Sequence, residues 1–90
     1  MPTQNVIVAS RVGLHGRPAA VIAEAAARFA EEILVSLVHP RDIDAEPADA
    51  ASPLMLMSLG AKCGDEVSVS STNAAAVARI CELIETELDG

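Results

Sequence analysis

A histidine, a glycine and an arginine stand together at the start of an alanine-rich stretch. Residues 12–29 read VGLHGRPAAVIAEAAARF, so that His15, Gly16 and Arg17 come directly before Pro18. Proline suits the first turn of a helix, because the N–H that it lacks would have no intrahelical partner there. The pattern predicts an imidazole and a guanidinium held together at a helix N-terminus.

These groups have the chemistry to receive a phosphoryl group. The free N–H groups and the dipole of a helix N-terminus favour an anion. Gly16 lets the backbone approach that anion, and Arg17 offers a planar fork of donors matched to phosphate oxygens. We expect one ring nitrogen of His15 to accept a hydrogen bond from a first-turn N–H, which would turn the other nitrogen outward as a nucleophile.

The residue types alone leave two interpretations open. In the first, His15 is a nucleophile that accepts a phosphoryl group; in the second, the chain is a small anion-binding α/β module with a passive histidine. No second acid or base and no cluster of metal ligands accompanies His15 in the sequence, and His39 falls in a loop. A nucleophile without further catalytic groups is typical of a carrier, so no cofactor and no metal are expected.

The composition narrows the class of protein. The 90 residues carry a formal charge of −7, which opposes general binding to nucleic acid or to anionic membranes. Phe29 is the single aromatic residue, so base stacking on aromatic side chains is excluded. Cys63 and Cys81 lack a paired spacing and are expected to be free thiols. With no long apolar run and no secretory signal, the sequence predicts a cytoplasmic protein with one domain over residues 1–90.

Hydrophobic periodicity predicts the elements that position His15. Strands are predicted at 5–9, 33–38 and 65–71, with a further short edge strand near Ile43 in an acidic loop over 39–51. Helices are predicted at 17–32, from 53 up to Gly60 with Ser52 as its N-cap, and at 74–88 with Thr72 or Asn73 as its N-cap. The apolar stripes of the two long helices are Ile22, Ala25, Ala26, Phe29 and Ile33, and Val77, Ile80, Cys81, Ile84 and Leu88.

The alternation in the last strand indicates the layer arrangement. Val67 and Val69 point to one side and Ser68 and Ser70 to the other, so one face of the strand is solvated. Such a strand suits an antiparallel or mixed sheet covered by helices on one side only. The predicted order is β-α-β-(β)-α-β-α, which is an open-faced α/β sandwich.

Two segments of the chain resemble the signatures of the HPr family, the histidine phosphocarriers of the bacterial phosphoenolpyruvate-dependent sugar phosphotransferase system. GLHGRPAA, residues 13–20, is similar to the family's phosphorylation-site motif. SPLMLMSLGA, residues 52–61, is similar to its second signature. The resemblance covers essentially the whole chain. It implies an α+β open-faced β-sandwich, with a four-stranded antiparallel sheet and three helices on one face.

The resemblance also implies the activity and the partners. His15 would accept a phosphoryl group on Nδ1 from phosphorylated enzyme I and pass it to a sugar-specific enzyme IIA, as a monomeric carrier that is not itself an enzyme. Gly16 and Arg17 would hold the phosphoryl oxygens during in-line transfer. A paralogue in a regulatory or nitrogen-linked phosphotransfer chain would have the same chemistry with other partners. The anion-binding module stays as the alternative from a different class.

A second surface is implied by the short helix after Ser52. Leu56 is expected to face the core, whereas Leu54 and Met57 share another side. In HPr proteins the matching surface, together with the positions of Ala20, Val21 and Glu24, surrounds the histidine and is shared by enzyme I and enzyme IIA. Adaptable Leu and Met side chains suit such successive partners.

Ser52 and Gly16 carry two further expectations. In some HPr proteins the serine that matches Ser52 is phosphorylated by an ATP-dependent kinase, and such a kinase or a transcriptional regulator is a possible partner; the alternative is a helix cap alone.

The sequence departs from the family in Pro53, in the longer acidic loop over 39–51, and in Gly16, where Ala or Thr is commoner. The glycine is expected to loosen the helix start by about 1 kcal/mol relative to alanine.

Overall fold

The structure is a computed structural model and describes residues 1–40 and 46–86. The strands are β1 (Thr3–Ile7), β2 (Leu34–Leu37), β3 (Ala48–Asp49) and β4 (Glu66–Ser70). The helices are α1 (Gly16–Ala26), α2 (Pro53–Ser58) and α3 (Ala74–Ile84). Along the chain they follow the order β-α-β-β-α-β-α, in which β3 takes the place of the optional strand in the predicted order.

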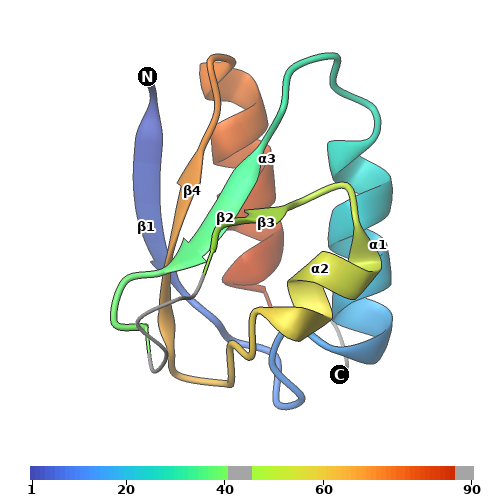
Figure 1. The fold of residues 1–90 in the computed structure, drawn as a ribbon, viewed down its shortest axis with the longest axis vertical. Coiled ribbons are helices and arrows are strands. Elements are labelled where there is room, and N and C mark those ends of the chain that lie inside the picture. The colour runs from blue at the N-terminus through green and yellow to red at the C-terminus, as the bar shows by residue number, and fades with distance from the viewer. Residues whose placement is uncertain (41–45, 87–90) are drawn as a thin grey trace.

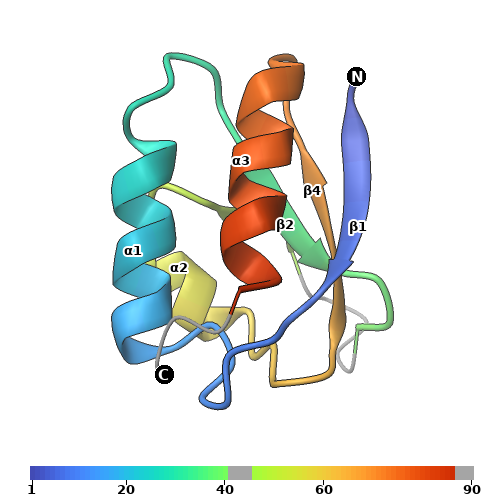
Figure 2. The ribbon, with the colours of Figure 1, turned by 180° about the vertical axis from the view of Figure 1, so that it is seen from behind.

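The four strands form one sheet in the order β1-β4-β2-β3, and every neighbouring pair is antiparallel. The three helices lie together on one side of this sheet, as the two opposite views show (Figure 1, Figure 2). The predicted class, an α+β open-faced sandwich with three helices on one face, is therefore confirmed. β1 lies at one edge of the sheet, so the first strand of the chain pairs with β4.

The inner face of the sheet is aliphatic. Val67 and Val69 of β4 are fully buried, whereas Ser68 and Ser70 are half-buried on the open face, as the alternation predicts. Helices with small side chains can pack close to such a sheet. The largest fully buried side chains of the described residues are Leu14, Ile22, Ile33, Leu56, Ile80, Ile84, Val8, Val35, Val67, Val69, Pro18 and Cys81.

The first helix ends earlier than predicted, and the predicted bounds 17–32 are wrong. α1 ends at Ala26, and two overlapping four-residue turns follow, in which Arg28 N–H donates to the Ala25 carbonyl and Phe29 N–H to the Ala26 carbonyl. The chain then leads back to the sheet, where the Ile33 carbonyl accepts from Ala50 N–H at 2.9 Å. Phe29 and Ile33 therefore lie against the core without belonging to the helix.

Other boundaries differ by a few residues. The first strand occupies Thr3–Ile7 instead of 5–9, because its pairing with β4 begins at Thr3 opposite Ser70. The fourth strand is β3, which pairs with β2 at Ala48 and Asp49; the predicted edge strand near Ile43 lies outside the described residues. The third helix is described to Ile84, and Leu88 also lies outside the described residues.

Candidate functional site at the N-terminus of α1

His15 is the N-cap residue of α1 and its side chain is exposed. Its backbone is extended, with φ −125° and ψ 162°, and the ring makes no capping hydrogen bond. The expectation that a ring nitrogen accepts from a first-turn N–H is therefore wrong. One reason is that Pro18, at the third helical position, has no N–H to offer to a cap. Both ring nitrogens of His15 remain open to solvent.

Gly16 begins α1 in a left-handed conformation, with φ +56°. An added Cβ would meet no atom within 4 Å, so the backbone conformation alone favours glycine there. The expected loosening of about 1 kcal/mol relative to alanine assumed an ordinary helical φ. The observed φ reverses that comparison, because an L side chain is strained in this region. Glycine therefore suits the junction between the extended His15 and the helix.

The first turn of α1 is electropositive and open. The N–H groups of Gly16 and Arg17 lack intrahelical partners, and no acidic residue lies in this turn. The Arg17 side chain is exposed. Ion pairs within the described residues join Arg28 to Glu24, His39 to Glu66 and Arg79 to Glu82, and Arg17 enters none of them. A guanidinium, two backbone donors and an imidazole thus meet at one helix end in a chain of net charge −7.

α2 lies beside this end of α1 (Figure 1). Ser52 is its N-cap, and the hydroxyl oxygen accepts from Met55 N–H at 3.3 Å, which confirms the predicted cap. Leu56 is fully buried, as predicted. Leu54 is 73% exposed, so it forms no part of the core.

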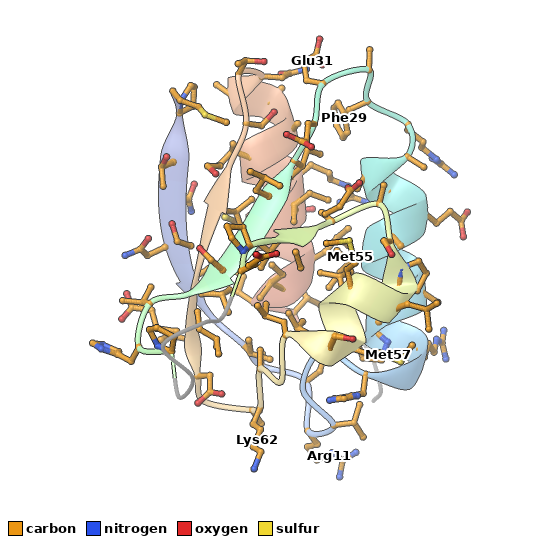
Figure 3. All side chains as sticks on the ribbon, viewed as in Figure 1. Arg11, Phe29, Glu31, Met55, Met57 and Lys62 are labelled. Carbon is orange, nitrogen blue, oxygen red and sulfur yellow. The ribbon has the colours of Figure 1, made fainter. Side chains whose placement is uncertain are left out.

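Of the two methionines of α2, the one predicted to lie on the same side as Leu54, Met57, is the more buried. Met57 is half-buried and packs against the core, whereas Met55 is 43% exposed (Figure 3). Met55 is an exposed apolar residue that the sequence prediction missed. A six-residue helix cannot bury all of its apolar residues, so the position of Met55 next to Leu54 could have indicated its exposure. On α1, Ala20 and Glu24 are exposed and Val21 is half-buried against the core. Glu24 pairs with Arg28 at 3.5 Å on the exposed face of the helix.

The two cysteines of the chain are not joined by a disulfide. Cys63 and Cys81 are both free; Cys63 is exposed, and burial together with the nearby Glu85 raises the pKa of the Cys81 thiol to about 11. A search of the described residues finds no group of three His, Cys, Asp or Glu side chains able to hold a metal ion. Within the same residues, no helix has the length and apolar character needed to cross a membrane.

Comparison with known proteins identifies the family of this chain. The family model described as "PTS HPr component phosphorylation site" matches residues 2–86. The phosphocarrier protein HPr of Treponema pallidum is 38% identical over 69 residues, which are 77% of this chain and 72% of that protein. The HPr of Streptomyces coelicolor is 30% identical over 90 residues, which are 100% of this chain and 91% of that protein.

Solved structures agree with the sequence comparison. The crystal structure of HPr from Thermoanaerobacter tengcongensis superposes with a TM-score of 0.82 at 28% identity, covering 100% of this chain and 98% of that one. The HPr of Bacillus anthracis shares the fold, with a TM-score of 0.79 at 23% identity over 92% of this chain and 95% of that one. The family match and the fold together define a phosphocarrier of the phosphotransferase system. The chain belongs to the HPr family, whose members are phosphocarrier proteins and not enzymes.

Proposed function

We propose that His15 is the residue that carries the phosphoryl group, on Nδ1. The observation that supports this assignment most is the open N-terminus of α1: the imidazole is exposed, makes no capping bond, and stands beside free first-turn donors. An anion placed there would meet the N–H groups of Gly16 and Arg17 and the positive end of the helix dipole. The Arg17 guanidinium would add a fork of donors to the phosphoryl oxygens.

The transfer follows from these groups in a single displacement. The lone pair on Nδ1 of neutral His15 attacks phosphorus in line with the donor's bond to phosphorus. The new N–P bond forms as the donor's bond breaks, the electron pair of that bond stays with the donor, and the ring proton of His15 remains on Nε2. Negative charge on the three equatorial oxygens is stabilised by Arg17 and by the first-turn N–H groups. The reverse displacement delivers the group to the acceptor.

The partners are components of the phosphotransferase system, and we propose the sugar branch in particular. Enzyme I would be the donor and a sugar-specific enzyme IIA the acceptor, with residues 1–90 acting as one HPr-like domain in the cytoplasm. The family membership supports this branch, and the two free thiols fit a reducing compartment. If the phosphorylated protein transfers to a nitrogen-linked enzyme IIA and not to a sugar-specific one, the assignment of the branch is wrong.

We further propose that both partners dock on one surface, the docking surface, which consists of Ala20, Val21, Glu24, Leu54, Met55 and Met57. Leu54 and Met55 give it an exposed apolar centre on α2, and Glu24 is a charged residue on its α1 side. An apolar centre with flexible side chains accommodates partners of unlike shape. The surface adjoins the helix end that carries His15, because α2 packs against α1.

Ser52 has a visible structural role as the cap of α2. That role explains the residue without regulation, and phosphorylation by a serine kinase is the alternative that the family resemblance implies. A phosphate there would add a charge of about −1.5 to −2 next to Leu54. Mass spectrometry of protein from sugar-fed cells is expected to show Ser52 unmodified; a stoichiometric phosphoserine would establish the regulatory role.

The central assignment is tested with His15→Ala. The variant is expected to keep its thermal stability, because the side chain is exposed and bonds to no neighbour, and to accept no phosphoryl group. The measurement is incorporation of label from radioactive phosphoenolpyruvate in the presence of enzyme I, with acid-labile, base-stable phosphate as the signature of phosphohistidine. Label on the alanine variant would overturn the assignment.

The docking surface is tested with Leu54→Glu. The variant is expected to weaken the affinity for enzyme I and for enzyme IIA together, with little change in thermal stability, because Leu54 is largely exposed. Ile7→Glu is the matched control, since Ile7 is also an exposed apolar residue but lies on β1, outside the docking surface. Unchanged affinity for both partners would place their contact elsewhere.

A further inference from the structure

We infer that Gly13 is a positioning residue for phosphoryl transfer. It is part of a contact between two backbone segments, residues 8–14 and 61–65, which we call the latch. The latch fixes His15 relative to the docking surface on α2. The inference rests on the proposed function, because it assumes that His15 receives the phosphoryl group.

The latch is made of backbone hydrogen bonds at both ends of the loop that precedes His15. At one end, Val8 N–H donates to the Asp65 carbonyl at 2.9 Å and Gly64 N–H donates to the Val8 carbonyl at 2.9 Å. At the other end, Leu14 N–H donates to the Ala61 carbonyl at 3.1 Å. Leu14 is 1% exposed and directly precedes His15, so the residue beside the histidine is anchored in the core.

The segment that receives the loop is itself held in shape. Lys62 N–H donates to an Asp65 carboxylate oxygen at 2.8 Å, and Asp65 N–H donates to the Lys62 carbonyl at 2.9 Å. Ala61 is fully buried. The side chains of Arg11 and Lys62 project from these two segments at the same end of the molecule (Figure 3). The turn is therefore a firm support for the loop.

Gly13 is the point where the two segments touch most closely. Its φ is +70°, and a Cβ at this position would overlap the carbonyl oxygen of Ala61 and approach Lys62 Cα to 2.9 Å. Both of these atoms belong to the backbone, so neither can swing aside as the end of a flexible side chain would. Any larger residue must push the loop away from the turn. His15 is two residues further along the chain and moves with the loop.

The latch connects the loop before His15 to the helix that carries the centre of the docking surface. The segment 61–65 follows α2 and Gly60 directly, and α2 carries Leu54 and Met55 of the docking surface. A docked partner contacts α2 and the exposed face of α1, and the latch joins the residue before His15 to the segment that follows α2. The position of Nδ1 relative to the partner's phosphoryl group therefore depends on the latch as well as on the packing of α1 against α2. A shift of about 1 Å in reacting groups is enough to slow a reaction roughly a hundredfold. Loss of the latch would therefore slow transfer without weakening docking.

The test compares Gly13→Ala with Gly60→Ala. Gly60 has nearly the same φ, +75°, but an added Cβ there meets no atom within 4 Å. Both variants lose the conformational freedom of glycine, and the overlap with the opposite backbone is specific to Gly13. Rapid-quench kinetics with phosphorylated enzyme I from a related bacterium give kcat and KM for the reaction in which this protein is the phosphoryl acceptor. For Gly13→Ala we expect kcat to be about a hundredfold lower and KM to stay within about twofold of the value for the unchanged protein. Gly60→Ala is expected to keep kcat within about threefold.

A reaction without a protein partner separates positioning from reactivity. Phosphoramidate phosphorylates histidine directly, so the rate for Gly13→Ala is expected to equal that of the unchanged protein. Equal kcat values for Gly13→Ala and the unchanged protein, or an equal loss in Gly60→Ala, would overturn the inference. If Gly13→Ala does not fold, Asp65→Ala takes its place: it removes the acceptor for Lys62 N–H, and an unchanged kcat would then overturn the inference. Failure of the unchanged protein to accept from enzyme I would instead overturn the proposed function.

Discussion

The N-termini of α1 and α3 are built in opposite ways. At α3, the Asn73 side-chain oxygen accepts from Ala75 N–H at 3.0 Å and from Ala76 N–H at 3.3 Å. The amide nitrogen of Asn73 also donates to Glu31 at 2.9 Å. At α1, the His15 side chain makes no such bond and the helix begins with a left-handed glycine. One helix start is closed by the protein itself, and the other is left open.

The capped N-terminus of α3 contributes to stability, whereas the uncapped N-terminus of α1 leaves its N–H groups free for a ligand. A side-chain cap stabilises a helix by about 1 kcal/mol, and α1 forgoes that contribution. Its stability comes instead from its buried face, which consists of Pro18, Ala19, Ile22, Ala23 and Ala26. The donors that a cap would occupy stay available for an anion. An open helix start on a well-packed helix therefore indicates a site, whereas the closed start of α3 indicates structure alone.

Among changes at the two helix starts that leave His15 in place, the largest effect is expected from Arg17→Ala. Transfer from enzyme I should slow by about 10²- to 10³-fold but not stop, because the nucleophile remains while charge stabilisation is lost. Stability should stay the same, because Arg17 enters no ion pair among the described residues. Rapid-quench measurement of phosphohistidine formation checks the rate. A rate unchanged from the parent protein would reduce Arg17 to a solvated side chain.

Gly16→Ala tests the left-handed entry into α1. The variant is expected to lose about 1–2 kcal/mol of unfolding free energy, because alanine is strained at φ +56°. Gly16→Asn is the matched comparison and should lose less, since asparagine tolerates this conformation better. Urea denaturation measures both. An alanine variant as stable as the parent would mean that the first turn of α1 can rearrange into a regular helix start.

Asn73→Ala tests the closed start. The free energy of unfolding is expected to fall by about 1 kcal/mol, because two N–H groups of the first turn lose their acceptor. Phosphoryl transfer should be unaffected, which is the reverse of the expectation for Arg17→Ala. Denaturation and label incorporation on the same sample give both values. A slower transfer in Asn73→Ala would show that the two helix starts are coupled.

The smallest effect is the pH dependence of the Asn73–Glu31 contact. The hydrogen bond from Asn73 holds the pKa of Glu31 below its ordinary value of 4.5. A lowered carboxyl pKa contributes stability above the unfolded-state pKa, and that contribution is lost as the pH falls through the folded-state pKa. The stability difference between the parent and Asn73→Ala should therefore narrow as the solution is acidified below 4.5. A constant difference would show that Glu31 adds nothing to the cap.

The sequence predicted the cap of α2 and narrowed the cap of α3 to Thr72 or Asn73, of which the structure has Asn73, whereas it failed at the start of α1. Ser52 and Asn73 have oxygens at the correct spacing from free N–H groups, and such local chemistry is readable from residue types. The missing cap at His15 was not predicted. It depends on Pro18 at the third helical position and on the φ of Gly16, which together decide where the ring can reach.

The layer arrangement and the buried face of α2 were also readable, because alternation and helical spacing report burial directly. The end of α1 could not be predicted from the sequence, because Phe29 and Ile33 continue the apolar spacing after the helix has ended. The contact of Gly13 with Ala61 was equally hidden. It joins segments that lie far apart in the sequence, and no local pattern reports such an approach.

The position of β1 at the sheet edge has a consequence for biosynthesis. Thr3 lies opposite Ser70, and Ile7 lies opposite Glu66, so the strand that is made first pairs with one made near the end. Such distant pairing has a large loop-closure entropy and tends to form late in folding. The loop that carries Gly13 and His15 follows β1 and is held by the turn before β4. A chain still being synthesised is therefore expected to lack an ordered loop before His15 until its last strand has emerged.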